Sequence, residues 1–129
     1  MFKSGAKRLT GTELESPRSL SSDDVQVVCG SSKKLNACGG QSATVPKTDT
    51  YNIRCCSDTE KSGWLKKSFC DVWGESDNDG ECFGAGTFDQ AVTKCSDNGA
   101  RLCTYNEIVS HCTQGSGCGY DKSFVWAAI

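Results

Sequence analysis

The chain has 129 residues, enough for one domain, with ten cysteines and a formal net charge of −2. Leu, Ile, Val and Phe together make up only about 17% of the residues, so hydrophobic burial alone is a thin basis for a stable core. The acidic balance argues against a nucleic-acid partner, and no apolar stretch is long enough to cross a membrane.

The ten cysteines are an even number, as complete pairing requires, and each disulfide typically adds about 2–4 kcal/mol of stability. No two of them have the Cys-x-x-Cys spacing of zinc and redox sites, and His111 is the only histidine. We therefore predict structural disulfides in an oxidising compartment, either the secretory pathway or the cell exterior. No signal peptide is visible, so we expect that a signal was removed or replaced, or that the chain is a piece of a longer protein. The cysteines predicted to pair are Cys29, Cys38, Cys55, Cys56, Cys70, Cys82, Cys95, Cys103, Cys112 and Cys118.

Residues 1–24 are rich in Ser, Thr, Gly, Lys and Glu and have no apolar periodicity, which predicts a flexible tail or linker. The cysteine-rich domain is expected over residues 25–129, and the VQVVC sequence at its start predicts a short strand. The next stretch, residues 30–50, is expected to be a long loop pinned by Cys29 and Cys38.

The sequence YNIRCC follows, and in it Tyr51, Ile53 and Cys55 alternate as they would in a half-buried strand. Side chains alternate across a strand, so the adjacent Cys55 and Cys56 should point to opposite faces. A bond between these two neighbours would be strained. We therefore expect them to join the strand to two different partners.

The segment SGWLKKSFCDVWG offers Trp64, Leu65, Phe69 and Trp73 as further core candidates, while its lysines should be solvated. We assign Trp73 and Trp126 to the core. Trp64 is the ring expected to be most exposed, and it is a candidate for stacking on a sugar.

A helix is predicted over residues 88–97, because Thr87 and Gln90 have the spacing of a capping box and Gly99 can end the helix in the left-handed conformation. Residues that recur at helical spacing within it are Phe88, Ala91, Val92 and Cys95.

A second helix is predicted over residues 105–112, with Thr104 and Glu107 as its capping box and Ile108 and Cys112 on one face. The Arg-Leu pair between the helices is expected to turn the chain. The sequence SFVW near the end predicts a further strand.

The acidic stretch ESDNDGE, residues 75–81, is the first candidate for a binding site. Glu75, Asp77 and Asp79 mimic the start of a calcium loop, but its twelfth position is Gly86 and not a bidentate glutamate. We favour a solvated acidic turn, with calcium or another hard cation as the alternative, and predict no other cofactor. The residues predicted to bind a ligand are Trp64, Asp77, Asp79 and Glu81.

No catalytic residues are predicted. His111 and Cys112 are adjacent, and neighbours one apart on a helix do not face each other. A cysteine held in a disulfide is also unavailable as a thiolate nucleophile.

Five motifs within residues 51–129 carry a resemblance to known proteins. They are Arg-Cys-Cys-Ser-Asp (54–58), Trp-Gly-Glu-Ser (73–76), Arg-Leu-Cys-Thr (101–104), Gly-Ser-Gly-Cys-Gly-Tyr-Asp (115–121) and Val-Trp (125–126). This set resembles a cysteine-rich domain of extracellular algal proteins, notably from diatoms. The stretch TFDQAVTKCSDNGARLCTYNE is also similar to the opening of the C-type-lectin-like fold, and GARLCTYNEI to the related formylglycine-generating-enzyme fold.

The resemblance implies a small α+β, disulfide-rich, C-type-lectin-like domain with two short helices packed on short antiparallel strands. The Glu-Pro-Asn or Gln-Pro-Asp tripeptide with which true C-type lectins bind sugar is absent. The active-site cysteines of formylglycine-generating enzymes lie beyond the matched segment. Neither of these chemistries therefore carries over to this chain.

We expect a non-enzymatic extracellular recognition or adhesion module that could form one repeat of a larger surface protein. Its partner would be a glycan or protein of the extracellular matrix or cell surface, or a second copy of itself. One alternative is a self-assembling structural component of an extracellular wall or filament. Another is a fragment of a formylglycine-generating-type enzyme fold.

Overall fold

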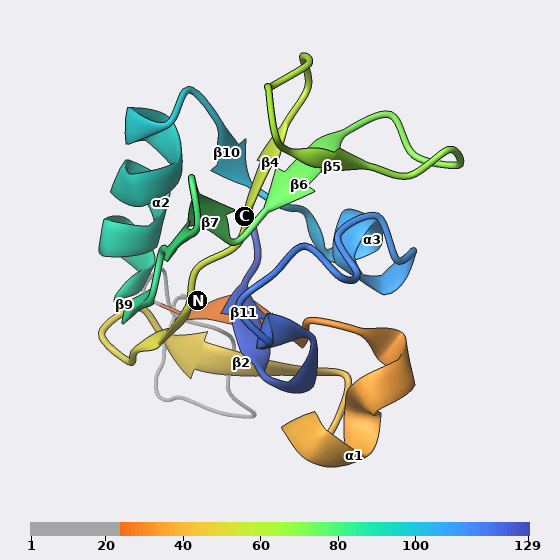
Figure 1. Ribbon diagram of the computed structural model, residues 1–129. Helices are drawn as coiled ribbons and strands as arrows, with labels where there is room; N and C mark the ends of the chain where they lie inside the picture. Colours follow the sequence, from red (N-terminus) through yellow and green to blue (C-terminus); the bar gives the residue numbers. More distant parts are fainter. Residues whose placement is uncertain (1–23) are drawn as a thin grey trace, which may run out of the picture.

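A computed structural model of the chain describes residues 24–129, which form a small α+β domain held by five disulfides (Figure 1). Its strands are β1 (Asp24–Cys29), β2 (Ser42–Pro46), β3 (Tyr51–Asn52), β4 (Cys55–Ser57), β5 (Leu65–Lys66), β6 (Trp73–Glu75), β7 (Asp77–Asn78), β8 (Glu81–Cys82), β9 (Ala85–Gly86), β10 (Arg101–Leu102) and β11 (Phe124–Trp126). Its helices are α1 (Leu35–Cys38), α2 (Phe88–Asp97) and α3 (Tyr105–Val109), with 3₁₀ turns η2 (Ser32–Lys34) and η3 (Tyr120–Lys122). The tail predicted over residues 1–24 lies outside the described residues, apart from Asp24 at the start of β1. Within residues 24–129, no helix has the length and apolar character needed to cross a bilayer.

The strands form two sheets and a separate hairpin. The larger sheet has the order β2-β1-β11-β3-β9, so the first and last strands of the described chain pair with each other. The second sheet has the order β10-β4-β6-β5, and β7 and β8 pair alone. The predicted antiparallel pairing is found throughout except between β11 and β3, which run parallel.

Two hydrophobic cores lie on opposite sides of the central strands, because side chains alternate along a strand. Val27 packs in the first core and its neighbour Val28 in the second. Trp126 and Val125 of β11 divide in the same way. Helix α2 contributes to the first core and α3 to the second.

Trp126 is fully buried in the first core, as predicted. Its ring makes edge-to-face contacts with Tyr51 and Phe88, whose ring centroids lie 5.2 and 5.6 Å away. Its indole N–H donates to the carbonyl of Gly86 at 2.8 Å, which satisfies the one polar atom of the side chain.

Residues 30–50 were expected to form a loop, but they contain η2, α1 and β2. Ser31 caps η2 by accepting a hydrogen bond from the backbone N–H of Lys33, and Gly39 ends α1 with a φ of 84°. Val45 of β2 is buried and Ala43 packs against the same core, while the other three residues of the strand are exposed, so the sequence of β2 does alternate. The prediction of a loop missed this short alternation, and antiparallel pairing with β1 completes the strand.

The first predicted helix is confirmed, and the second is shorter than predicted. Both capping boxes form, and α2 has the predicted bounds, although Val92 is 43% exposed. Helix α3 ends at Val109 because His111 takes a left-handed conformation, with a φ of 69°, that cannot continue it. The Arg-Leu pair expected to be a turn is strand β10, paired with β4.

Two aromatic residues predicted to be in the core are not buried. Phe69 is 66% exposed, and Trp73 is half-buried, with Lys66 Nζ 5.8 Å from its ring centroid. The loop between β5 and β6 carries Phe69 away from both cores, which no local pattern in the sequence announces.

The adjacent Cys55 and Cys56 enter different cores, as predicted from strand alternation. Cys55 bonds Cys95 of α2, and Cys56 bonds Cys103 next to α3. No cysteine remains free, because the other pairs are Cys29–Cys38, Cys70–Cys112 and Cys82–Cys118.

Arg54, directly before these cysteines, is a fully buried charge. Its Nε donates to Ser76 Oγ at 2.8 Å, and Nη1 donates to the Gly30 carbonyl and to Asp121 Oδ1, both at 3.1 Å. Burial lowers the pKa of Arg54, and the charge of Asp121 opposes that effect. A Cβ at residue 30 would lie 2.1 Å from the carbonyl oxygen of Tyr120, so only glycine allows this approach.

We predict that the disulfides differ in their contribution according to the loop that each closes. Cys55–Cys95 spans 40 residues and Cys29–Cys38 spans 9. Replacing both cysteines of a pair with alanine should cost about 4 kcal/mol for the first and about 2.5 kcal/mol for the second, since a longer loop loses more entropy on closure. Urea unfolding of the two variants measures this, and equal or reversed losses would contradict it.

Asp121→Asn should cost about 3 kcal/mol, because it leaves Arg54 buried without its counter-charge. Asparagine keeps an acceptor for the Gly115 N–H, so the loss reports the charge. Asp71→Asn is the control, since that residue is exposed and forms no ion pair within residues 24–129. Equal unfolding free energies for the two variants would show that the Arg54 charge needs no partner.

Candidate functional site

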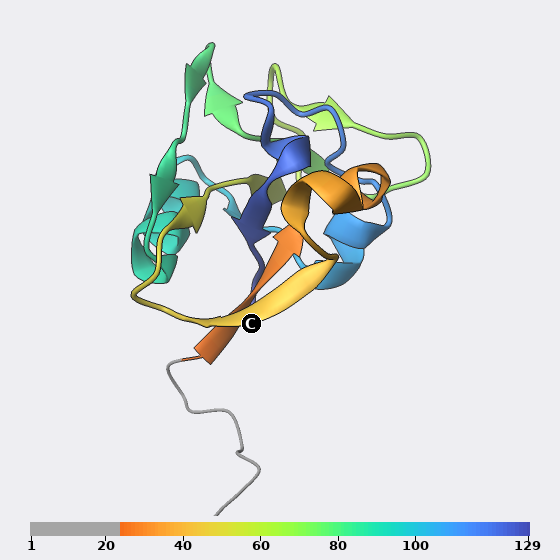
Figure 2. The ribbon, with the colours of Figure 1, turned by 90° about the horizontal axis from the view of Figure 1, so that it is seen from below.

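The acidic stretch of residues 75–81 forms a hairpin that projects from the domain (Figure 2). Glu75 ends β6, strands β7 and β8 pair antiparallel, and Asp79 and Gly80 form the turn with φ values of 54° and 86°. Two-residue turns with both φ values positive favour Asp-Gly. This geometry agrees with the interpretation of the stretch as a solvated acidic turn.

The base of the hairpin is fixed and its tip is free. The disulfide Cys82–Cys118 holds one side, and the backbone N–H of Ser76 donates to the Ser116 carbonyl at 3.2 Å on the other. Residues 78–81 are exposed. The hairpin therefore presents acidic groups from an anchored base.

Glu75 is the half-buried carboxylate of this group. One of its oxygens accepts a hydrogen bond from the Ser76 N–H at 2.9 Å. Burial raises the pKa of Glu75, the Ser76 hydrogen bond opposes this, and the negative charge of Asp77 raises it further. Gly117 packs against both carboxylates, since a Cβ there would lie 3.0 Å from Glu75 Oε1 and 3.6 Å from Asp77 Oδ2.

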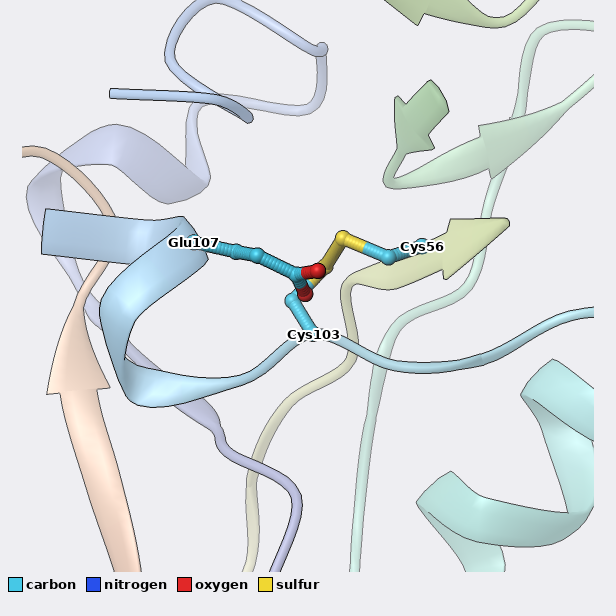
Figure 3. A group of neighbouring side chains, drawn as sticks. All are labelled: Cys56, Cys103 and Glu107. Atoms are coloured by element: carbon cyan, nitrogen blue, oxygen red, sulfur yellow. A yellow bond between two sulfur atoms is a disulfide. The ribbon is translucent and has the colours of Figure 1, made fainter. Parts of the chain in front are cut away.

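Glu75, Asp77 and Asp79 do not converge as a set of three ligands. Among residues 24–129, the group of His, Cys, Asp or Glu side chains whose ligand atoms all lie within 4.8 Å of one another is Cys56, Cys103 and Glu107. Figure 3 shows the Glu107 carboxylate beside the Cys56–Cys103 disulfide. Because both sulfurs are bonded to each other, they offer no thiolate to a metal.

Glu107 instead belongs to an ion-pair network with Arg101. The guanidinium donates to both Glu107 oxygens at 2.9 and 2.8 Å, and to both Asp58 oxygens at 3.1 and 2.7 Å. Glu107 also accepts from the Thr104 N–H at 2.8 Å, which completes the capping box of α3. This network joins β10, the end of β4 and α3.

The charged groups in this network stabilise one another in their ionised forms. Burial alone would raise the pKa of Glu107, but the hydrogen bonds from Arg101 and Thr104 outweigh it and hold the pKa below its usual range. The same guanidinium lowers the pKa of Asp58, and both carboxylates raise the pKa of Arg101. The network stabilises the scaffold and offers no group for chemistry.

Trp64, expected to be the most exposed ring, is half-buried against the first core. Its ring centroid lies 6.4 Å from that of Phe83, and Lys61 Nζ lies 5.2 Å from it. Phe83 directly follows β8, so Trp64 lies near the base of the acidic hairpin. The structure thus brings these two predicted ligand-binding elements close together.

His111 and Cys112 do not form a nucleophile and base, because Cys112 is bonded to Cys70. His111 instead lines a pocket with Gln114 from its own turn, Lys67 and Phe69 from the β5–β6 loop, and Lys33 from η2, a group that the sequence did not reveal. The signal available in the sequence is Phe69, close to two lysines and next to a cysteine, and its prediction as a core residue is wrong.

Comparison with protein-family models, curated proteins and solved structures finds no match for this chain. The site is therefore interpreted from its own geometry.

The Arg101 network predicts an acid-dependent loss of stability that Glu107→Gln removes. Because the pKa of Glu107 is lowered in the folded state, the unfolded chain binds more protons at acidic pH. This contribution is complete above the unfolded pKa of about 4.3 and is lost as the pH falls through the lower folded value. Urea unfolding between pH 7 and pH values of about 2.5 should show a flatter acid slope for Glu107→Gln than for wild type. Glu60→Gln, at an exposed residue without an ion pair in the described chain, should keep the wild-type slope, and parallel slopes for all three proteins would contradict the prediction.

Proposed function

We propose that this chain is a non-enzymatic recognition or adhesion module of the cell exterior or secretory pathway, and a unit of a larger surface protein. The observation that carries the proposal is that the disulfides build a rigid scaffold, while the acidic hairpin is exposed on its surface. All ten cysteines are paired, while the acidic hairpin stands clear of both cores on an anchored base. Binding functions commonly lie on loops that a rigid scaffold positions.

The same bridges support this compartment, because disulfides persist in oxidising environments. The motif resemblance of residues 51–129 to the cysteine-rich domain of extracellular algal proteins supports this assignment. The formylglycine-generating alternative is less well supported, since it rests on the single stretch GARLCTYNEI.

The hairpin and Trp64 form the contact surface that we propose for the partner. The carboxylates of Asp77, Asp79 and Glu81 would bind a cation or a basic group, and the half-buried Trp64 near the hairpin base would add apolar contact. The partner is a glycan or protein of the extracellular matrix or cell surface, or a second copy of the chain.

Asp77→Asn with Asp79→Asn tests this surface. Asparagine tolerates the positive φ of residue 79, and Asn-Gly is a preferred hairpin turn, so unfolding free energy should change by less than about 0.5 kcal/mol. A glycan array, a calcium titration and sedimentation analysis of self-association on the wild-type domain would identify the kind of partner. The double variant should weaken whichever interaction the wild type shows.

Asp49→Asn with Glu60→Gln is the control, because it removes two exposed negative charges elsewhere and should leave binding unchanged. If the wild type is blank in all three assays and the hairpin variant unfolds, the hairpin is structural and the proposed contact surface is wrong. Self-association without any other ligand would favour the self-assembling structural alternative.

A further inference from the structure

A pocket of about 250 Å³ lies where three distant segments meet. The β5–β6 loop, η2 and the turn after α3 supply its walls. Figure 1 shows this loop and α3 on the same side of the molecule. The lining residues are Lys33, Lys67, Phe69, His111 and Gln114.

One disulfide fixes two walls of this pocket. Phe69 directly precedes Cys70 and His111 directly precedes Cys112, and these cysteines are bonded to each other. His111 has a φ of 69°, a conformation that residues other than glycine adopt rarely and that clusters at functional sites. The backbone that carries the aromatic ring and the imidazole is therefore anchored by this disulfide.

Ser31 positions the remaining walls. Its hydroxyl accepts from the Lys33 N–H at 3.1 Å and lies 3.3 Å from Gln114 Oε1, to which it donates. The carbonyl end of the Gln114 amide is thus occupied, while its NH₂ group has no hydrogen bond within the described residues. This leaves two N–H donors for a ligand.

The pocket contains several groups without partners. Lys33 and Lys67 form no ion pair within residues 24–129, where the ion pairs are made by the two arginines. The Nδ1 atom of His111 is buried and lacks a hydrogen bond in this part of the chain. Phe69 is 66% exposed, although its neighbour Cys70 is buried. Unpaired cations and an exposed aromatic ring thus meet at this pocket, beside the His111 ring.

The basic surface continues beyond this pocket. A second pocket of about 380 Å³ shares Lys33 and adds Lys34 and Lys122 to its lining. A chain with a net charge of −2 thus gathers four lysines over two adjoining pockets. Such a surface raises the local concentration of an anionic ligand.

We propose that these two pockets bind an acidic polysaccharide. Phe69 would stack on the apolar face of one sugar ring, and Lys33 and Lys67 would pair with its sulfate or carboxylate group. Gln114 and His111 would hydrogen-bond its hydroxyls, and the next charged sugar would reach Lys34 and Lys122. An acidic peptide fits less well, because acidic motifs are typically recognised by arginine clusters, and these pockets are lined by lysines around one exposed ring and, among residues 24–129, by no arginine. This inference rests on the proposed recognition function and adds a surface separate from the acidic hairpin.

Binding of dextran sulfate, polygalacturonate and neutral dextran, measured by calorimetry at low and physiological salt, tests the proposal. At least one of the two charged polysaccharides should bind, more weakly as salt rises, and neutral dextran should not. Lys33→Gln with Lys67→Gln should weaken that binding by about ten-fold or more, and Phe69→Ala by about five-fold. Because Phe69 is exposed, its removal should leave the thermal unfolding midpoint unchanged.

Lys47→Gln with Lys94→Gln is the matched control, since it removes two positive charges outside both pockets. This pair should change affinity by less than about two-fold. An equal loss of affinity in the control would show that binding depends on diffuse charge attraction, and it would contradict the proposed site. Tighter binding of poly-glutamate than of either polysaccharide would also contradict it. If wild type binds neither charged polysaccharide, this inference fails, while the hairpin variant tests the recognition function separately.

Discussion

Three consecutive residues, Arg54, Cys55 and Cys56, connect the two hydrophobic cores with the ends of the described chain. Strand alternation sends Cys55 into the core beneath α2 and Cys56 into the core beneath α3, and each is bonded there. Arg54 reaches back to Gly30 at the end of β1 and across to Asp121 near the end of the chain. This chain is poor in large apolar residues, and it has two small cores in place of one large core. Strand β4 lies between them and is bonded into each by a disulfide.

The motifs that carry the algal resemblance turn out to contact one another. Arg54 of the first motif pairs with Asp121 of the fourth, while Asp58 of the first pairs with Arg101 of the third. The first and third are also joined by the Cys56–Cys103 disulfide. These residues therefore specify a scaffold and leave the identity of the ligand to the segments between them.

Local signals were the ones that could be predicted from the sequence. The capping boxes of α2 and α3 and the opposite directions of Cys55 and Cys56 depend on residues a few positions apart, and all three are confirmed. The exposure of Phe69 depends instead on a disulfide partner far along the chain, so no local pattern announces it. The short Ala43–Val45 alternation of β2 was present in the sequence and was not recognised as a strand. The basic pocket was missed because its walls come from three segments far apart in the sequence, which the Cys70–Cys112 disulfide and the Ser31–Gln114 hydrogen bond bring together.

Within the described chain, the arginines and the lysines of the basic surface have different roles. Both arginines are used inside the scaffold, where the planar guanidinium donates to several fixed acceptors at once. The lysines of the basic surface have no such partners, and a flexible, hydrated ammonium costs little to leave in solvent. A buried arginine without its carboxylate would destabilise the fold, whereas a surface lysine can be lost or moved at small cost. The same chain can therefore hold its architecture constant through arginine and cysteine, while lysine and the acidic hairpin adjust what its two charged surfaces recognise.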